Sequence, residues 1–187
     1  MEKVKTLNKK EKILSIISTT KAKYIIGTIL LCGVGITLPR IFHIAFGSNA
    51  GATFLPMHIA VLIAALTFGM TSSLVVAGSS IIMSHLLTNM PAITRLPYML
   101  IELVIYGIIL ALFSKKTNAY ISLIATIILG RILYAGVLFA ATNLGFPTYG
   151  TTVWKSAKIG IPGLIIQLIV VPVIAKVMNE RLNLKND

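Results

Sequence analysis

Seven polar side chains stand inside long apolar stretches of this chain, and their types are those that bind ligands or move protons. They are His58, His85, Asn89, Glu102, Tyr106, Arg131 and Tyr134. An ionisable residue in lipid costs at least about 2.5 kcal/mol, so it normally faces a partner or a cavity. The pattern raises three possibilities: a buried ion pair, a metal or hydrolytic site, and a binding site for a polar small molecule.

Catalytic motifs give little support for an enzyme. The sequence contains neither a phosphate-binding loop of the GxxxxGK[ST] kind nor HExxH. His58, His85 and Glu102 lack the spacing of a metal site. Ser84 precedes His85 directly, which points the two side chains to different faces of a helix. We expect no enzyme, no cofactor and no metal; the alternative is an intramembrane hydrolase or a metal-dependent enzyme that uses His58, His85 and Glu102.

The elements that must position these side chains are membrane-spanning helices. The chain has 187 residues and is 56% hydrophobic and 12% charged, about half the charged fraction of a soluble domain. Helices satisfy their own backbone hydrogen bonds in lipid, and the apolar runs are too continuous for barrel strands. The sequence predicts an all-α integral membrane protein with one domain over residues 1–187. Its six predicted spans are residues 24–39, 54–69, 72–90, 96–114, 120–143 and 159–178.

Lysine and arginine set the expected orientation. The net charge is +12, and cations beside apolar runs are typical of a membrane protein rather than of one that binds nucleic acid. Most of the 17 Lys and Arg fall on one side of six spans, so we expect both termini in the cytoplasm and the protein in the cell membrane. Residues 1–22 are basic and predict a helix on the inner surface; a signal peptide is the rival interpretation.

The connections between the predicted spans differ in length. Residues 70–71 leave room only for a tight helical hairpin. Residues 40–53 and 144–158 are rich in Gly, Ser, Asn and Pro, and we expect them to be long outer loops that act as lids.

The polar residues fall at a similar depth in different spans. At 1.5 Å per residue, His58 lies about 5 Å, Glu102 about 9 Å and Arg131 about 12 Å below the outer face. His85 and Asn89 reach the same outer half, and the two tyrosines are one turn from Glu102 and Arg131. This layer predicts an outward-facing polar pocket with His58 at its rim. Three simpler interpretations stay open: a purely structural pair of Glu102 and Arg131, an interfacial His58, and a hydrogen-bonded helix contact at His85.

Three sequence motifs carry a resemblance to a known family. They are FLPMHIAVLIAALTFG at residues 54–69, PYMLIELVIYG at residues 97–107 and LGRILYAG at residues 129–136. Their order and spacing, with the size and basic N-terminus of the chain, resemble the substrate-binding S component of energy-coupling factor (ECF) vitamin transporters. The resemblance covers the full chain.

The resemblance implies a function and partners. An S component captures a vitamin or related micronutrient at the outer face and topples in the membrane to carry it inward. It works with a transmembrane scaffold subunit and two ATPase subunits. The family's pocket lies at the outer side under the first and third outer loops. The positions that match it here are Met57, His58, Asn89, Glu102, Tyr106 and Arg131, and we add His85 and Tyr134 from the depth layer.

Two further expectations follow from the resemblance. Family members often dock to the scaffold through an AxxxA pattern on the first span; this chain lacks the alanine pair, and Thr28, Cys32 and Gly35 form the nearest stripe of small residues. The His, Glu, Arg and Tyr side chains suit a pyridoxine-like or pyrimidine-like ligand, with cobalamin and pantothenate as open alternatives. A nickel or cobalt ligand is disfavoured, because Met57-His58 is internal rather than N-terminal.

Overall fold

The structure is a computed structural model that describes residues 20–47, 50–146 and 153–182, and within these ranges it is helical, without strands. The helices are α2 (Thr20–Phe46), α3 (Ala50–Phe54), α4 (Pro56–Thr67), α5 (Met70–Thr88), α6 (Leu96–Phe113), α7 (Ala119–Asn143) and α8 (Val153–Leu182). Six segments are long and apolar enough to cross a membrane, the second formed by α3 and α4 together. The predicted all-α fold with six spans is therefore confirmed, and it indicates a multi-pass membrane protein.

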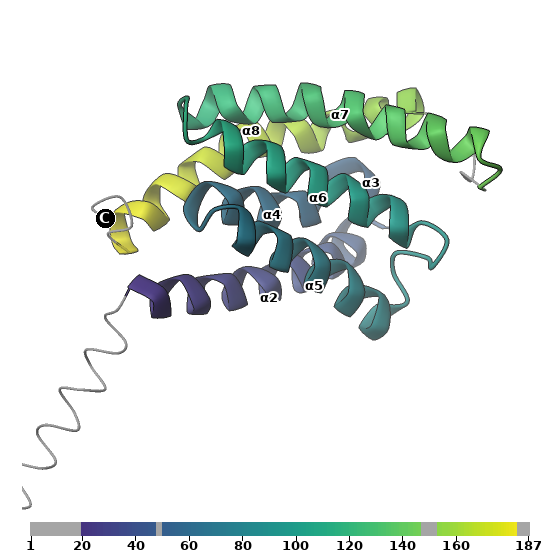
Figure 1. Cartoon of the computed structure of the whole chain (residues 1–187). Helices are drawn as coiled ribbons and strands as arrows, with labels where there is room; N and C mark the ends of the chain where they lie inside the picture. Colours follow the sequence, from purple (N-terminus) through teal and green to yellow (C-terminus); the bar gives the residue numbers. More distant parts are fainter. Residues whose placement is uncertain (1–19, 48–49, 147–152, 183–187) are drawn as a thin grey trace, which may run out of the picture.

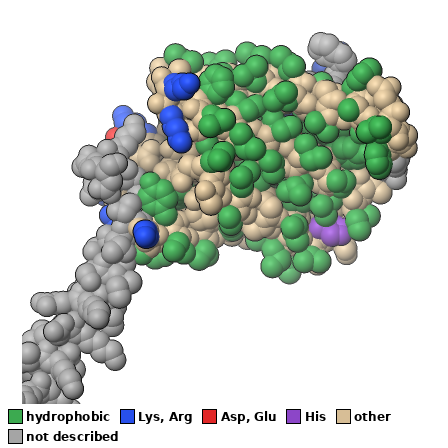
Figure 2. All heavy atoms as spheres, in the orientation of Figure 1, with side chains coloured by type: hydrophobic (Ala, Val, Ile, Leu, Met, Phe, Trp, Pro, Cys, Tyr) green, Lys and Arg blue, Asp and Glu red, His purple; other side chains and the backbone are tan. Residues whose placement is uncertain are grey.

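Helix α4 forms the centre of the bundle, and the other helices surround it (Figure 1). It packs against α2, α5, α6 and α8. In the segment that contains it, 67% of the residues are buried, against 22–39% in the other five spans. The surrounding helices turn Ile, Leu and Val side chains outward (Figure 2), as contact with lipid tails requires. A residue on α4 is therefore enclosed by protein on almost every side.

The first and last described helices meet at one end of the molecule. The Lys23 Nζ donates a hydrogen bond to the backbone oxygen of Leu182 at 3.0 Å. The start of α2 and the end of α8 therefore lie on the same side, as an even number of spans requires. Most of the Lys and Arg side chains visible in Figure 2 gather at this end, where α2 begins in Figure 1. The surface segment expected at residues 1–22 lies outside the described residues, except for residues 20–22 in α2.

The prediction of an outer loop at residues 40–53 is wrong for most of these residues, which are helical. Helix α2 continues through Pro39 to Phe46, and α3 begins at Ala50. Hydropathy marks where a helix leaves lipid, not where it ends, and Pro is tolerated inside spanning helices. The rings of Phe42, Phe46 and Phe54 lie 5.1–5.6 Å apart and hold the extension of α2 against α3.

The other connections agree better with the sequence. The hairpin of α4 and α5 is confirmed, but its turn lies at Phe68 and Gly69, where Gly69 has φ 83°, a value that favours glycine. The second expected outer loop, residues 144–158, is shorter than predicted because α8 already begins at Val153. Its residues 147–152 lie outside the described residues.

Candidate functional site

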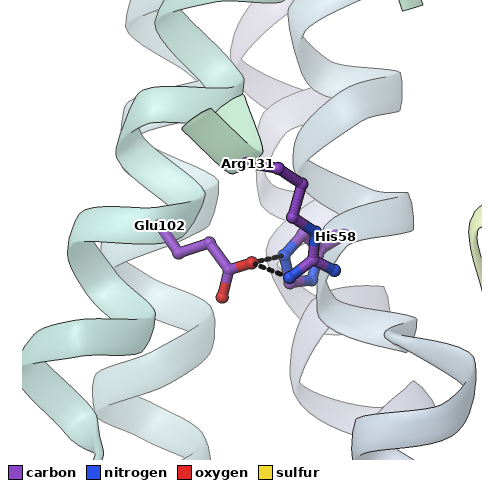
Figure 3. A network of polar contacts seen from close by, with 3 residues as sticks. All are labelled: His58, Glu102 and Arg131. Carbon is purple, nitrogen blue, oxygen red and sulfur yellow. Dashed lines mark ion pairs between the residues drawn. The ribbon is translucent and has the colours of Figure 1, made fainter. Parts of the chain in front are cut away.

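Three of the predicted residues meet at the centre of the bundle in a buried ionic contact (Figure 3). The Arg131 Nη1 lies 3.1 Å and the His58 Nε2 lies 3.6 Å from the same oxygen, Glu102 Oε1. The side chains are 3%, 9% and 14% exposed for His58, Glu102 and Arg131. At 3.6 Å, His58 is in electrostatic contact with the carboxylate rather than hydrogen-bonded to it. We call His58, Glu102, Arg131 and the adjacent Tyr106 the charged cluster.

Local backbone features place each member of the charged cluster. Pro56 begins α4 after Leu55, whose φ of 49° turns the chain sharply between α3 and α4 and sets His58 in the first helical turn. Glu102 and Tyr106 are four residues apart on α6 and share a face. Both are buried. Three different spans thus contribute to one site.

The ring of Tyr106 packs against two other helices of the site. Its ring meets the His58 ring edge to face, with centroids 5.2 Å apart and planes at 85°. The ring also lies against Gly130 on α7, where an added Cβ would be only 2.6 Å from the Tyr106 Cε2. The glycine that precedes Arg131 is therefore needed to let α7 approach α6 closely enough for the ion pair.

Several polar atoms of the charged cluster have no hydrogen-bond partner in the described part of the chain. The hydroxyl of Tyr106 and the Nε and Nη2 of Arg131 are buried and have no hydrogen-bond partner among the described residues. Buried polar groups are nearly always paired, and an unpaired one costs about 1–3 kcal/mol. The cluster therefore offers more hydrogen-bonding capacity than its own ion pairs consume.

Gln167 on α8 is a further candidate that the sequence reasoning missed. Its side chain is fully buried, and both Oε1 and Nε2 have no hydrogen-bond partner among the described residues. Its signal in the sequence is plain in retrospect, because it is an amide in the middle of the apolar run at residues 159–178. Seven residues earlier, a Cβ added to Gly160 would lie 3.4 Å from the Arg131 Nη2. Gly160 and Gln167 share a helix face, so Gln167 lies on the same side of α8 but about 10 Å further along the helix than the contact with Arg131.

Two other predicted site residues, Met57 and Tyr134, lie close to the charged cluster in the chain. Met57 precedes His58 and belongs to the apolar core, with 5% of its surface exposed. Tyr134 follows Arg131 by three residues on α7 and is buried. Their burial is consistent with a lining role, and direct contact with a ligand stays a prediction.

His85 and Asn89 lie apart from these contacts, at the end of α5. The ring nitrogen Nδ1 of His85 is 2.8 Å from the backbone oxygen of Pro91. Asn89 is exposed and ends α5 in a left-handed conformation with φ 53°. The described hydrogen bond of His85 is thus with the link between α5 and α6 rather than with another helix, and a role in ligand binding stays a prediction for both residues.

The metal-dependent or hydrolytic alternative gains no support from this arrangement. It requires His85 to join His58 and Glu102, whereas the described contact of the His85 ring is with Pro91. In the part of the chain that the structure describes, no three His, Cys, Asp or Glu side chains are placed to hold a metal ion. The Glu102 carboxylate that meets the His58 imidazole is also paired with Arg131.

The predicted docking stripe faces the interior of the bundle. The hydroxyl of Thr28 donates to the Ser72 Oγ at 2.9 Å, and the Ser79 Oγ donates to the Cys32 Sγ at 3.0 Å. A Cβ added to Gly35 would collide with the side chain of Ser80. The stripe is a packing surface between α2 and α5, so a docking surface for a partner would have to use other residues.

The spare donors of Arg131 and the hydroxyl of Tyr106 give the charged cluster the capacity to bind a small polar molecule. The cluster resembles the polar centre of a ligand site in that these groups converge from separate helices in an otherwise apolar interior. Comparison with known proteins adds no assignment: no protein-family model, no curated protein and no solved structure matches the chain.

Proposed function

We propose that this protein captures a vitamin or vitamin-like small molecule at the outer face of the cell membrane and delivers it inward as the S component of an ECF transporter. The observation that carries the proposal is the surplus of buried polar atoms in the charged cluster. Arg131 and Tyr106 together leave three such atoms without a partner among the described residues. A ligand that pairs with them offsets a cost that helix packing alone leaves in place.

The arrangement of charges also supports binding rather than simple helix fastening. A structural ion pair in a bundle is most stable when both ions are fully satisfied. Here one oxygen of Glu102 contacts both His58 and Arg131 (Figure 3). The Nε and Nη2 of Arg131 have no hydrogen-bond partner among the described residues. Specific recognition of a polar ligand by a few convergent groups in an apolar site is the usual design of small-molecule sites.

The orientation and the partners are part of the same proposal. Both termini face the cytoplasm, because the described basic ends of α2 and α8 lie together and basic ends remain on the inner side. The chain lacks a GxxxxGK[ST] loop, so the energy for transport comes from the two ATPase subunits, to which the scaffold subunit connects this protein. A pyridoxine-like or pyrimidine-like compound remains our preferred ligand.

Native mass spectrometry of gently purified protein tests this function. We expect one small molecule bound per chain and released chemically unchanged on denaturation. In the Tyr106→Phe variant the molecule should be absent, or its affinity should be about tenfold lower. Lys176→Gln, which removes an exposed charge on α8, serves as the control and should retain the ligand. A released molecule that has been chemically converted, with turnover abolished by changing His58 or Glu102, would contradict the proposal and favour an enzyme.

A further inference from the structure

We propose that the free edge of Arg131, formed by Nε and Nη2, binds a carboxylate group of the transported molecule. The inference rests on the proposed function and adds the chemical class of its ligand. A guanidinium presents donors in a rigid planar fork, and each edge of the fork matches the two oxygens of a carboxylate. Glu102 engages only Nη1, at 3.1 Å. The edge made by Nε and Nη2 is buried and has no partner among the described residues.

Gly160 lets α8 pack closely against this edge of Arg131. A Cβ at Gly160 would lie 3.4 Å from the Arg131 Nη2 and 3.1 Å from the Leu55 Cδ1. Both distances are tight for a Cβ, so the glycine permits a close approach of α8 to the guanidinium and to the link between α3 and α4. A ligand group at this edge therefore has to reach it from a side that α8 does not cover.

The charges around this edge are compatible with an added anion. Glu102 supplies one negative charge to Arg131, and His58 lies against the same carboxylate at 3.6 Å. A neutral ligand would form weaker hydrogen bonds with the guanidinium than a carboxylate does. The difference is largest in a buried, low-dielectric site such as this one.

Benzoate and benzamide form a matched pair of probes for this proposal, because they share a ring and a planar end group but differ in charge. We expect the wild-type protein in detergent micelles to bind benzoate about tenfold or more tightly than benzamide, as charge-assisted hydrogen bonds require. Arg131→Lys keeps the charge but loses the fork, so it should reduce this ratio to about twofold. The control Arg95→Lys, at an exposed arginine before α6, should leave the ratio unchanged.

The outcomes separate this inference from the proposed function. Equal responses to benzoate and benzamide in the wild type, including no response to either, would overturn it, as would a ratio preserved in Arg131→Lys. Should Arg131→Lys fail to fold, the molecule retained by the wild-type protein decides: a compound that forms a methyl ester supports the carboxylate, and a compound without an acid group overturns it. A retained but neutral micronutrient would refute the carboxylate while leaving the transport function standing.

Discussion

The interface of α2 with α5 and the charged cluster both place polar side chains among apolar helices, but they use them in opposite ways. At the interface, the hydroxyls of Thr28 and Ser79 find partners across the helices. In the cluster, Arg131 and Tyr106 keep buried polar atoms that no described residue satisfies. At the interface, the Ser80 hydroxyl beside Gly35 is an exception, because it has no hydrogen-bond partner among the described residues. Small paired hydroxyls hold helices together, whereas the spare donors of the cluster are the feature on which the proposed ligand binding rests.

The largest effect should come from breaking the ion pair of the charged cluster. Glu102→Gln or Arg131→Gln alone leaves a buried charge uncompensated, so we expect the free energy of unfolding to fall by about 3–5 kcal/mol. Unfolding in mixed detergent micelles measures it. The control is Lys176→Gln, which breaks the exposed pair of Lys176 and Glu180 and should change stability by at most about 0.5 kcal/mol. Equal losses in the free energy of unfolding at the buried and the exposed pair would show that burial of the Glu102 and Arg131 pair has no special effect on stability.

A glycine on α8 tests how closely the helices around the cluster must approach. A Cβ at Gly163 would lie 2.7 Å from the backbone carbon and oxygen of Phe54. Because that neighbour is backbone and cannot rotate away, we expect Gly163→Ala to lower the free energy of unfolding by about 1–3 kcal/mol. Gly136→Ala on α7 is the control, since nothing lies within 4 Å of its added Cβ. Similar melting temperatures for the two variants would show that α8 moves freely against α3.

Gln167 separates a structural role from a binding role most cleanly. Gln167→Leu removes two buried polar atoms that have no partner among the described residues. We therefore expect stability to be unchanged or to rise by about 1 kcal/mol. If the amide contacts the ligand, the affinity should nevertheless fall about tenfold. A destabilised variant would instead mean that Gln167 is held by the protein, and it would remove this residue from the site.

The smallest effect is expected at the interface of α2 with α5. Thr28→Val keeps the shape of the side chain but removes its hydrogen bond to Ser72. Hydrogen bonds between membrane helices contribute about 0.6 kcal/mol on average, so the free energy of unfolding should fall by about that amount. Ligand affinity should not change. A loss of affinity in Thr28→Val would show that the two regions are coupled.

The sequence predicted the six spans and named the four residues of the charged cluster, but it grouped His85 and Asn89 with them. Continuous apolar runs reveal the helices that cross lipid, and a charged residue inside such a run must find a partner. A contact of Glu102 and Arg131 was one of the interpretations that those two facts left open, and the structure places the two side chains 3.1 Å apart. The sequence was weaker at helix ends, because hydropathy does not report the aromatic packing that extends α2 to Phe46.

Side-chain direction accounts for the remaining differences. Depth along a helix placed His85 in the same layer as His58, but depth does not say which way a side chain points, and the His85 ring meets Pro91. The same limit applies to Thr28, Cys32 and Gly35, which face α5 rather than the outside. Gln167 was overlooked because a neutral amide is less conspicuous than a charge, although an unpaired amide is also costly in lipid.

The double variant Glu102→Gln with Arg131→Gln gives the most direct test of the claim that the spare polar atoms of the cluster serve a ligand. It removes both charges together, so much of the stability lost in each single variant should return. The measurement is a titration with the molecule retained by the wild-type protein, at a matched folded fraction. We expect affinity weakened by about 2 kcal/mol or more, because the charge-assisted bonds to the ligand are gone. Full recovery of affinity in the folded double variant would contradict the account and make Glu102 and Arg131 a fastening between α6 and α7.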